Sequence, residues 1–248
     1  MVELKTPATI PAMDAGVDGV EYVHDKVRRA ILRGTLEAGA TISQLQLARD
    51  LGVSRTPLRE ALRLLQREGL IEASRNRSVR VASCSVEDAE QLYTSRITLE
   101  ALAIRISIPM MRPEDLAQLG GLMAQMTHFA DAADYERWEV PHRAFHAALV
   151  MGAGTRIATM LAQLSDHAER YRRQYSQEAP QARSASVAEH QAILDACLSG
   201  DADAGAARMV EHLGSVATGL IHLADPRYEA VALRTAMRGA ATPFGPSI

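Results

Sequence analysis

Residues 47–71 read LARDLGVSRTPLREALRLLQREGLI, and this stretch is the most informative part of the amino-terminal region. It predicts one helix, a tight turn around Gly52 and a second helix that opens at Ser54. Ser54 is a typical N-cap residue, and Pro57 lies in the first turn, where a helix needs no backbone N–H. Apolar residues then recur at helical spacing and predict a buried stripe of Leu58, Ala61, Leu62 and Leu65. The stretch therefore indicates a helix-turn-helix.

The second helix of this motif carries a separate basic flank. Arg55, Arg59 and Arg63 are spaced four residues apart, beside Thr56. Like charges at this spacing repel by a few tenths of a kcal/mol per pair, so the flank favours a bound anion. A phosphate backbone with guanine edges nearby suits arginines at a helix N-terminus. The flank predicts a DNA-reading helix; the alternative is a plain packing motif with solvated arginines.

A predicted hairpin after the second helix favours the DNA-reading alternative. Glu68 and Gly69 end the helix, since glycine is the usual residue just past a helix C-terminus. Residues 71–73 and 79–81 then read as two short strands. The tip between them, SRNRS at residues 74–78, holds two arginines. A wing that contacts phosphates or the minor groove needs such a tip.

Residues 22–82 resemble the winged-helix domain of GntR-type bacterial transcription regulators. The resemblance is carried by ILRG at 31–34, GVSRTPLREAL at 52–62 and EGLI at 68–71. It implies that operator DNA is contacted by Ser54, Arg55, Thr56 and Arg59, next to Arg63, and by the wing residues Arg75, Asn76 and Arg77. Two wing positions depart from the family: Ser78 stands where glycine is usual, and Arg75 where proline is usual.

The resemblance also implies how such a protein works. Members commonly repress transcription until a metabolite binds. One head supplies too few contacts for useful specificity, so a homodimer that reads a short palindrome in double-stranded DNA is expected.

The charge distribution agrees with a DNA-binding head. The 248 residues carry a net charge of −3, but residues 21–83 hold 12 Lys and Arg against 7 Asp and Glu, whereas residues 84–248 hold 14 against 20. A basic head on an acidic body suits a chain of which only the head meets DNA. Neither a membrane span nor a signal peptide is indicated, and the two cysteines are isolated, so a cytoplasmic protein is expected.

The pattern predicts a mostly α fold in two domains. Residues 1–19 are expected to be disordered, 20–83 to form the winged helix-turn-helix domain, 84–238 an all-helical domain, and 239–248 a flexible tail. From Ser85 onward we expect an antiparallel bundle of six or seven helices. Their approximate bounds are 85–108, 112–130, 133–151, 155–177, 184–199, 202–223 and 226–238.

Four of the eight histidines are placed as a metal site requires. His142 and His146 stand four apart and leave one helix face together. His190 and His212 lie at similar distances from the turn near Gly200, so an antiparallel hairpin sets them nearly level. Imidazoles suit Zn, Ni, Cu or Fe-type divalent ions. The alternative is four satisfied core histidines; the remaining four, for which no partners are indicated, are read as surface or packing residues: His24, His128, His167 and His222.

Residues 85–223 resemble the FCD ligand-binding domain of the FadR branch of GntR regulators. The resemblance rests on YTSRITLE at 93–100, Phe145-His146, EHQAILDA at 189–196, Gly200-Asp201 and Glu211-His212. Metal-containing members have an Asp or Asn and three histidines. His146, His190 and His212 match the three histidines, and His142 takes the place of the acid. That exchange removes a negative ligand, which favours a softer ion or a weaker site.

A small carboxylate effector is expected to bind at open positions of the ion. Arg96 is a second candidate contact for a carboxylate, unless it pairs with Glu100 one turn later. Arg143 and Arg173 are further candidates. Two alternatives stay open: a regulator that senses the metal itself, and a metal-dependent hydrolase. Against the hydrolase, position 143 is arginine where a zinc-protease helix offers glutamate as the general base.

Overall fold

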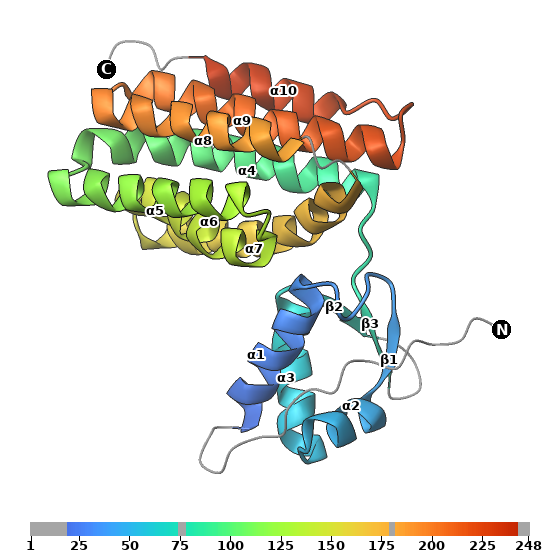
Figure 1. Ribbon diagram of the computed structural model, residues 1–248. Coiled ribbons are helices and arrows are strands. Elements are labelled where there is room, and N and C mark those ends of the chain that lie inside the picture. Colours follow the sequence, from blue (N-terminus) through green and yellow to red (C-terminus); the bar gives the residue numbers. More distant parts are fainter. Residues whose placement is uncertain (1–18, 74–77, 179–181, 243–248) are drawn as a thin grey trace. The chain divides into compact units, whose positions relative to one another are not determined.

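The computed structural model describes residues 19–73, 78–178 and 182–242 (Figure 1). The chain divides into two compact units between Cys84 and Ser85. This division lies next to the domain boundary expected from the sequence. None of the helices in the described ranges is long and apolar enough to cross a bilayer.

The first unit is a small helical domain with a three-stranded sheet. Its elements are α1 (Gly19–Leu32), β1 (Thr41–Ser43), α2 (Gln44–Leu51), α3 (Arg55–Arg67), β2 (Ile71–Ala73) and β3 (Ser78–Val81). The antiparallel sheet has the order β1-β3-β2, with Ile42 opposite Val79. The two wing strands are confirmed, but β1 was not predicted, because its three residues gain their hydrogen bonds only from β3, far along the chain.

A glycine turn joins α2 to α3. Gly52 has a φ of 66°, in the left-handed region, and its backbone N–H donates to the carbonyls of Ala48 and Arg49. Leu47, Leu51, Leu58 and Leu65 pack into the core with residues of α1. The helix-turn-helix is therefore fixed by a local turn and a shared apolar core.

The second unit contains only helices among its described residues. They are α4 (Val86–Ser107), η1 (Ile108–Met110), α5 (Pro113–Asp131), α6 (Tyr135–Val150), η2 (Met151–Ala153), α7 (Thr155–Glu178), α8 (Ala182–Ser199), α9 (Ala202–Ala224) and α10 (Val231–Ala241). Within the unit, α4 packs against α9 and α10 on one side and against α6 and α7 on the other, whereas α5 and α8 pack against each other (Figure 1). Because α4 is covered on both sides, it buries polar as well as apolar side chains. The arrangement confirms the predicted all-helical bundle.

Both ends of the described chain differ from the expectation. Gly19, expected to be disordered, is the first residue of α1, and residues 1–18 lie outside the described ranges. At the other end, α10 starts at Val231, not 226, and includes residues 239–241, which were expected to belong to a flexible tail; residues 243–248 are outside the described ranges.

A tertiary contact sets the start of α10. The buried Glu90 of α4 accepts hydrogen bonds from the backbone N–H groups of Ala232 and Leu233, at 2.7 and 3.2 Å, and from the Tyr228 hydroxyl at 2.6 Å. A carboxylate thus supplies acceptors to the N–H groups that a helix start leaves free. No pattern within residues 226–231 announces this, because the acceptor lies on another helix.

Gly152 gives a test of the packing against α4. A Cβ atom added at Gly152 would lie 2.8 Å from Cα of Ser107, an atom of the α4 backbone that cannot turn aside. Gly152→Ala is expected to lower the free energy of unfolding by about 1–3 kcal/mol, the usual cost of overpacking. Gly121→Ala is the control: its Cβ would meet nothing within 4 Å in the middle of α5, so the free energy of unfolding should rise, by up to about 1 kcal/mol. Chemical denaturation followed by circular dichroism measures both, and equal effects would contradict the prediction.

Candidate DNA-reading helix and metal centre

The basic flank of α3 faces solvent. Arg55, Arg59 and Arg63 are exposed, as are Ser54 and Thr56, whereas the apolar stripe on the other side of the helix is buried. Within the described part of the chain, none of the three arginines forms an ion pair. All three guanidinium groups are therefore available to an external anion.

The start of α3 differs from the expectation in one respect. Ser54 holds the N-cap position with extended backbone angles, but its hydroxyl makes no capping hydrogen bond. The hydroxyl and the N–H groups of the first turn thus remain available to a phosphate oxygen. The wing residues Arg75, Asn76 and Arg77 lie outside the described ranges. Ser78, at the base of the wing, lines a recess of about 130 Å³ together with Arg59 and Arg63.

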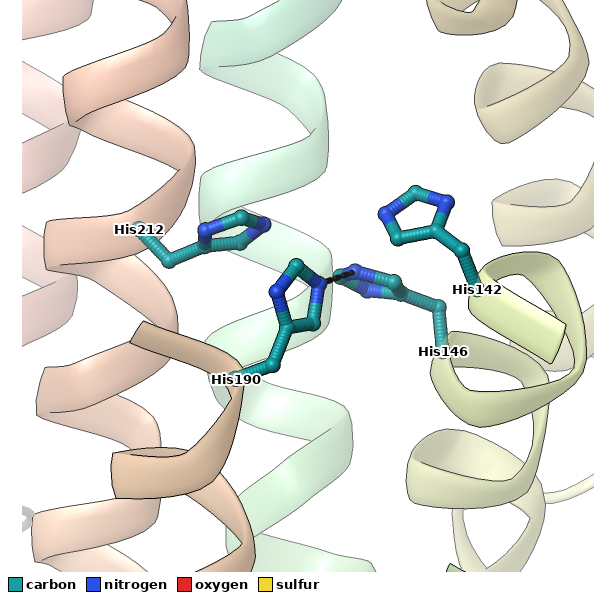
Figure 2. A group of neighbouring side chains, drawn as sticks. All are labelled: His142, His146, His190 and His212. Carbon is teal, nitrogen blue, oxygen red and sulfur yellow. Dashed lines mark hydrogen bonds between the residues drawn. The ribbon is translucent and has the colours of Figure 1, made fainter. Parts of the chain in front are cut away.

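The four predicted histidines come together inside the second unit. His142 and His146 extend from α6, His190 from α8 and His212 from α9, and their rings point toward one another (Figure 2). One ring nitrogen of each lies within 4.8 Å of the others, and all four side chains are buried. The rings of His190 and His212 are 4.3 Å apart, so the helical hairpin does set them level.

Outer partners orient three of the imidazoles. Nδ1 of His146 donates to Glu100 Oε2 at 3.2 Å, Nδ1 of His212 to Glu189 Oε2 at 2.7 Å, and Nδ1 of His190 to the Ser186 carbonyl at 2.5 Å. With the proton held at Nδ1, each Nε2 keeps a lone pair. The Nε2 atoms of His146 and His190 face each other at 3.2 Å, the contact drawn dashed in Figure 2. Two lone pairs at that distance repel unless a cation lies between them.

The donor set fits a divalent ion. Tetrahedral Zn–N bonds of about 2.0–2.1 Å place nitrogens about 3.3 Å apart, close to the 3.2 Å between His146 and His190. Burial lowers the pKa of His142, His190 and His212 well below the usual value, and the neighbouring imidazoles lower it further. The rings are therefore neutral at neutral pH, which is the form that binds a metal.

Arg96 forms an ion pair with Glu100, the alternative to a ligand contact that the sequence left open. Its Nε donates to Glu100 Oε1 at 2.8 Å, and both side chains are buried. Burial alone would raise the pKa of Glu100, but Arg96 and the hydrogen bond from His146 outweigh it and lower the pKa to about 2. Glu100 is thus ionised and links a cation on one side to a histidine of the cluster on the other.

The other two predicted arginines are also paired. Arg143 bonds to Asp166 and, at 3.0 Å, to Glu169, and Arg173 bonds to Glu169 at 3.2 Å. Arg143 lies at a half-open cavity of about 520 Å³ between α6 and α7, whose lining also includes Arg96, Glu100 and His146. The cavity therefore connects solvent with one histidine of the cluster.

Comparisons with known proteins identify both units. Residues 20–81 match the sequence profile of bacterial regulatory proteins, gntR family, and residues 91–215, half of the chain, match that of the FCD domain. An uncharacterized HTH-type transcriptional regulator from an unstable DNA locus of Streptomyces ambofaciens is 31% identical over 197 residues, which are 78% of this chain and 81% of that protein. The chain belongs to the GntR family.

Further similarities support the same conclusion for this GntR-family protein. The HTH-type transcriptional repressor GlaR of Escherichia coli (strain K12) is 28% identical over 162 residues, 63% of this chain and 71% of that protein. The structure of E. coli McbR/YncC shares the fold, with a TM-score of 0.74 at 22% identity over 84% of this chain and 99% of that chain. The protein is a DNA-binding transcriptional regulator and not an enzyme, so the hydrolase alternative is excluded.

Two residues beside the cluster of this GntR-family protein escaped the sequence analysis. Arg172 of α7 donates from Nη2 at 2.5 Å to Glu139, whose carboxylate lies 3.5 Å from Nδ1 of His142. Tyr93 of α4 is fully buried, with the Arg96 guanidinium 5.4 Å from its ring centre. Helical spacing could have pointed to Arg172. It lies four residues after Ala168 and eleven after Leu161, so the three residues share one face of the helix, and Leu161 and Ala168 are buried.

Proposed function

We propose that this GntR-family protein is a repressor whose hold on its operator is controlled by a small carboxylate, bound at a metal ion in the FCD domain. The observation that carries the proposal is the set of four buried imidazoles whose ring nitrogens lie within 4.8 Å of one another. The DNA-binding unit supplies the output, and the relative GlaR, named a repressor, supports repression. The protein acts on chromosomal DNA in the cytoplasm.

The contacts with DNA divide into two kinds. Arg55, Arg59 and Arg63 reach base edges and phosphates in the major groove, while Ser54 and Thr56 at the helix start hold phosphates. Arg75, Asn76 and Arg77 of the wing reach the neighbouring backbone or minor groove. Two copies related by a twofold axis read a palindrome, because one recognition helix covers only a half-site.

His142, His146, His190 and His212 would hold the ion, which supplies positive charge to a carboxylate. Since all four ligands are neutral, the ion keeps its full charge, and Zn, Ni or a similar borderline ion suits imidazole best. Glu100, Glu189 and the Ser186 carbonyl keep the ligand rings in place through their Nδ1 atoms. These partners orient three of the four rings without an ion.

The contacts of α7 suggest how effector binding could change the conformation at the start of α4, the helix that follows the DNA-binding unit in the chain. The Tyr171 hydroxyl donates to Asp88 Oδ2 at 2.5 Å and contacts the Ser85 carbonyl at 3.4 Å, at the start of α4, where the chain arrives from β3. A shift of α7 on effector binding would pull on this start. Regulation follows only if the effector binds the two arrangements with different affinity.

One observation favours a second candidate, a regulator that senses the metal alone. Arg96, Arg143 and Arg173 are each paired with a carboxylate of the protein, so none of them needs an organic anion. In that case the ion itself, by drawing α6, α8 and α9 together, would set the conformation of the domain.

Metal analysis tests the centre directly. Protein purified without added ions, or loaded with zinc and desalted, is expected to hold about one divalent ion per chain. Trp138, the single tryptophan, stacks on the His142 ring at 4.3 Å, so chelation should change its fluorescence. His146→Ala should lose most of the ion and this response. The control His222→Ala removes an exposed histidine of α9 and should keep both.

Two outcomes would count against a metal-bound carboxylate effector, the first against the metal site and the second against the effector. Retention of the ion by His146→Ala would contradict the assignment of the cluster. Zinc-loaded protein whose operator affinity responds to the chelator but to no carboxylate would favour the metal sensor.

A further inference from the structure

Unsatisfied buried polar atoms gather beside the histidine cluster. Within the described ranges, Tyr93 Oη, Arg172 Nε and Nη1 and His142 Nδ1 are buried without a hydrogen-bond partner. The Thr94 hydroxyl, next to Tyr93 on α4, shares this state, as does that of Ser107, which lies about 21 Å further along the helix and away from the cluster. A buried donor without a partner costs stability, so several of them at one place indicate a bound group that completes them.

Shared contacts place Arg172 next to the cluster. Glu139 Oε1 accepts from Arg172 Nη2 at 2.5 Å, and the same oxygen lies 3.5 Å from Nδ1 of His142. The guanidinium and the imidazole are therefore separated by no more than these two distances together. The Tyr93 hydroxyl lies close enough to Arg172 for a polar contact, which opposes the rise in the pKa of Tyr93 caused by burial. The geometry of this contact falls short of a full hydrogen bond, so the hydroxyl and the Nε and Nη1 atoms of Arg172 remain unsatisfied.

The chemistry of these atoms specifies the missing group. Arginine offers donors and no acceptor, and the phenol hydroxyl of tyrosine also donates. A guanidinium and a hydroxyl that both donate toward one place match an anionic oxygen group. Among such groups, a carboxylate fits the planar donors of arginine well. Glu139 occupies one nitrogen of Arg172 and leaves Nε and Nη1 for a ligand.

We infer that Arg172 and Tyr93 bind the carboxylate of the effector, beside the ion held by the four histidines. The inference rests on the proposed function and adds a second contact point, on α4 and α7, to the one that the ion provides. Arg172 directly follows Tyr171, whose hydroxyl bonds to Asp88 near the start of α4. A ligand that displaces Arg172 therefore also displaces Tyr171, the residue that bonds near the start of α4.

Tyr93→Phe separates ligand binding from folding, because it removes only the hydroxyl oxygen. A hydroxyl without a partner does not stabilise the ligand-free protein, so its melting temperature should stay unchanged or rise. The affinity for a carboxylate should fall about tenfold, the loss of one hydrogen bond to a charged group. The probes are malonate and acetate, added to the zinc-loaded full-length protein, and the readout is their dose-dependent rise of the melting temperature.

Ser107→Ala is the matched control, since it also removes a buried hydroxyl without a partner from α4. It should bind the probes as the wild type does. Arg172→Met should lower the affinity for the probes by about 30-fold or more, because a charge-assisted contact is lost. Metal content and Trp138 fluorescence verify that each variant keeps its ion and its fold.

Three results would overturn the inference: Tyr93→Phe with wild-type affinity, Tyr93→Phe with a lowered melting temperature and unchanged relative binding, or no stabilisation of the wild type by either probe. Failure of the metal site appears separately, as absence of zinc from the wild type. In that event the same titrations on the zinc-free protein still test Arg172 and Tyr93.

Discussion

Joint replacement of Arg55 and Arg59 by alanine is expected to weaken operator binding by about 100-fold or more, since each arginine that reads a guanine contributes about 1–3 kcal/mol. Both side chains are exposed on α3 and have no ion pair within the described residues, so their loss should not affect folding. Binding to unrelated DNA should fall less, because it depends on phosphate contacts alone. The dependence of affinity on salt should also become shallower.

The operator for this measurement comes from selection of bound duplexes out of a random pool, followed by anisotropy titration. Arg67→Ala is the control, because Arg67 continues the spacing of the flank but lies in the last turn of α3, about 18 Å along the helix from Arg55. It should leave sequence preference unchanged. Full affinity of the double variant for the selected duplex would show that α3 does not read DNA.

Arg96→Met is expected to lower the free energy of unfolding of the helical unit by about 3–5 kcal/mol, because it leaves Glu100 buried, charged and without its main partner. In the wild type, Arg96 and the hydrogen bond from His146 hold the pKa of Glu100 at about 2 against the effect of burial. Without Arg96, burial raises the pKa of Glu100, so the cost is largest at neutral pH and becomes smaller in acid, where the carboxyl can take up a proton. The ionised Glu100 of the wild type stabilises the fold above the pKa of the unfolded carboxyl, and this contribution falls as the pH drops toward about 2. Urea unfolding monitored by the single tryptophan, Trp138, reports on this unit alone.

Two further variants isolate the buried pair. Arg112→Ala breaks an exposed pair with Asp115 and should have a far smaller effect on the free energy of unfolding, because solvent screens this pair. Combining Arg96→Met with Glu100→Leu removes both charges and should recover much of the stability lost in the single variant. The double variant should still bind zinc less tightly, since His146 loses its outer partner. A single variant as stable as the wild type would show that Glu100 tolerates burial unpaired.

Sequence patterns were sufficient where the deciding interactions are local. The turn at Gly52, the apolar stripe of α3 and the flank of arginines depend on spacing along one helix or one turn. The same holds for His142 and His146, one helical turn apart. Even the level placement of His190 and His212 followed from helix rise and a short connection.

Patterns were insufficient where a partner lies on another element. Strand β1 exists because β3 pairs with it, and α10 begins where Glu90 accepts its N–H groups. Whether Arg96 faces a ligand or Glu100 was left open, because both fit the spacing and only the packing around α4 selects one. The sequence favours Arg173 over its neighbour Arg172, whereas the structure shows that Arg172 shares the Glu139 carboxylate with His142.

Periodicity and short-range turns are enough to specify the helix-turn-helix, the helical class of the second unit and the residue types at its centre. Which charges neutralise one another, and which buried donors lack a partner, depends instead on how the helices pack. Those outcomes depend on distances between helices far apart in the chain, and burial makes a difference of a few ångströms there energetically large.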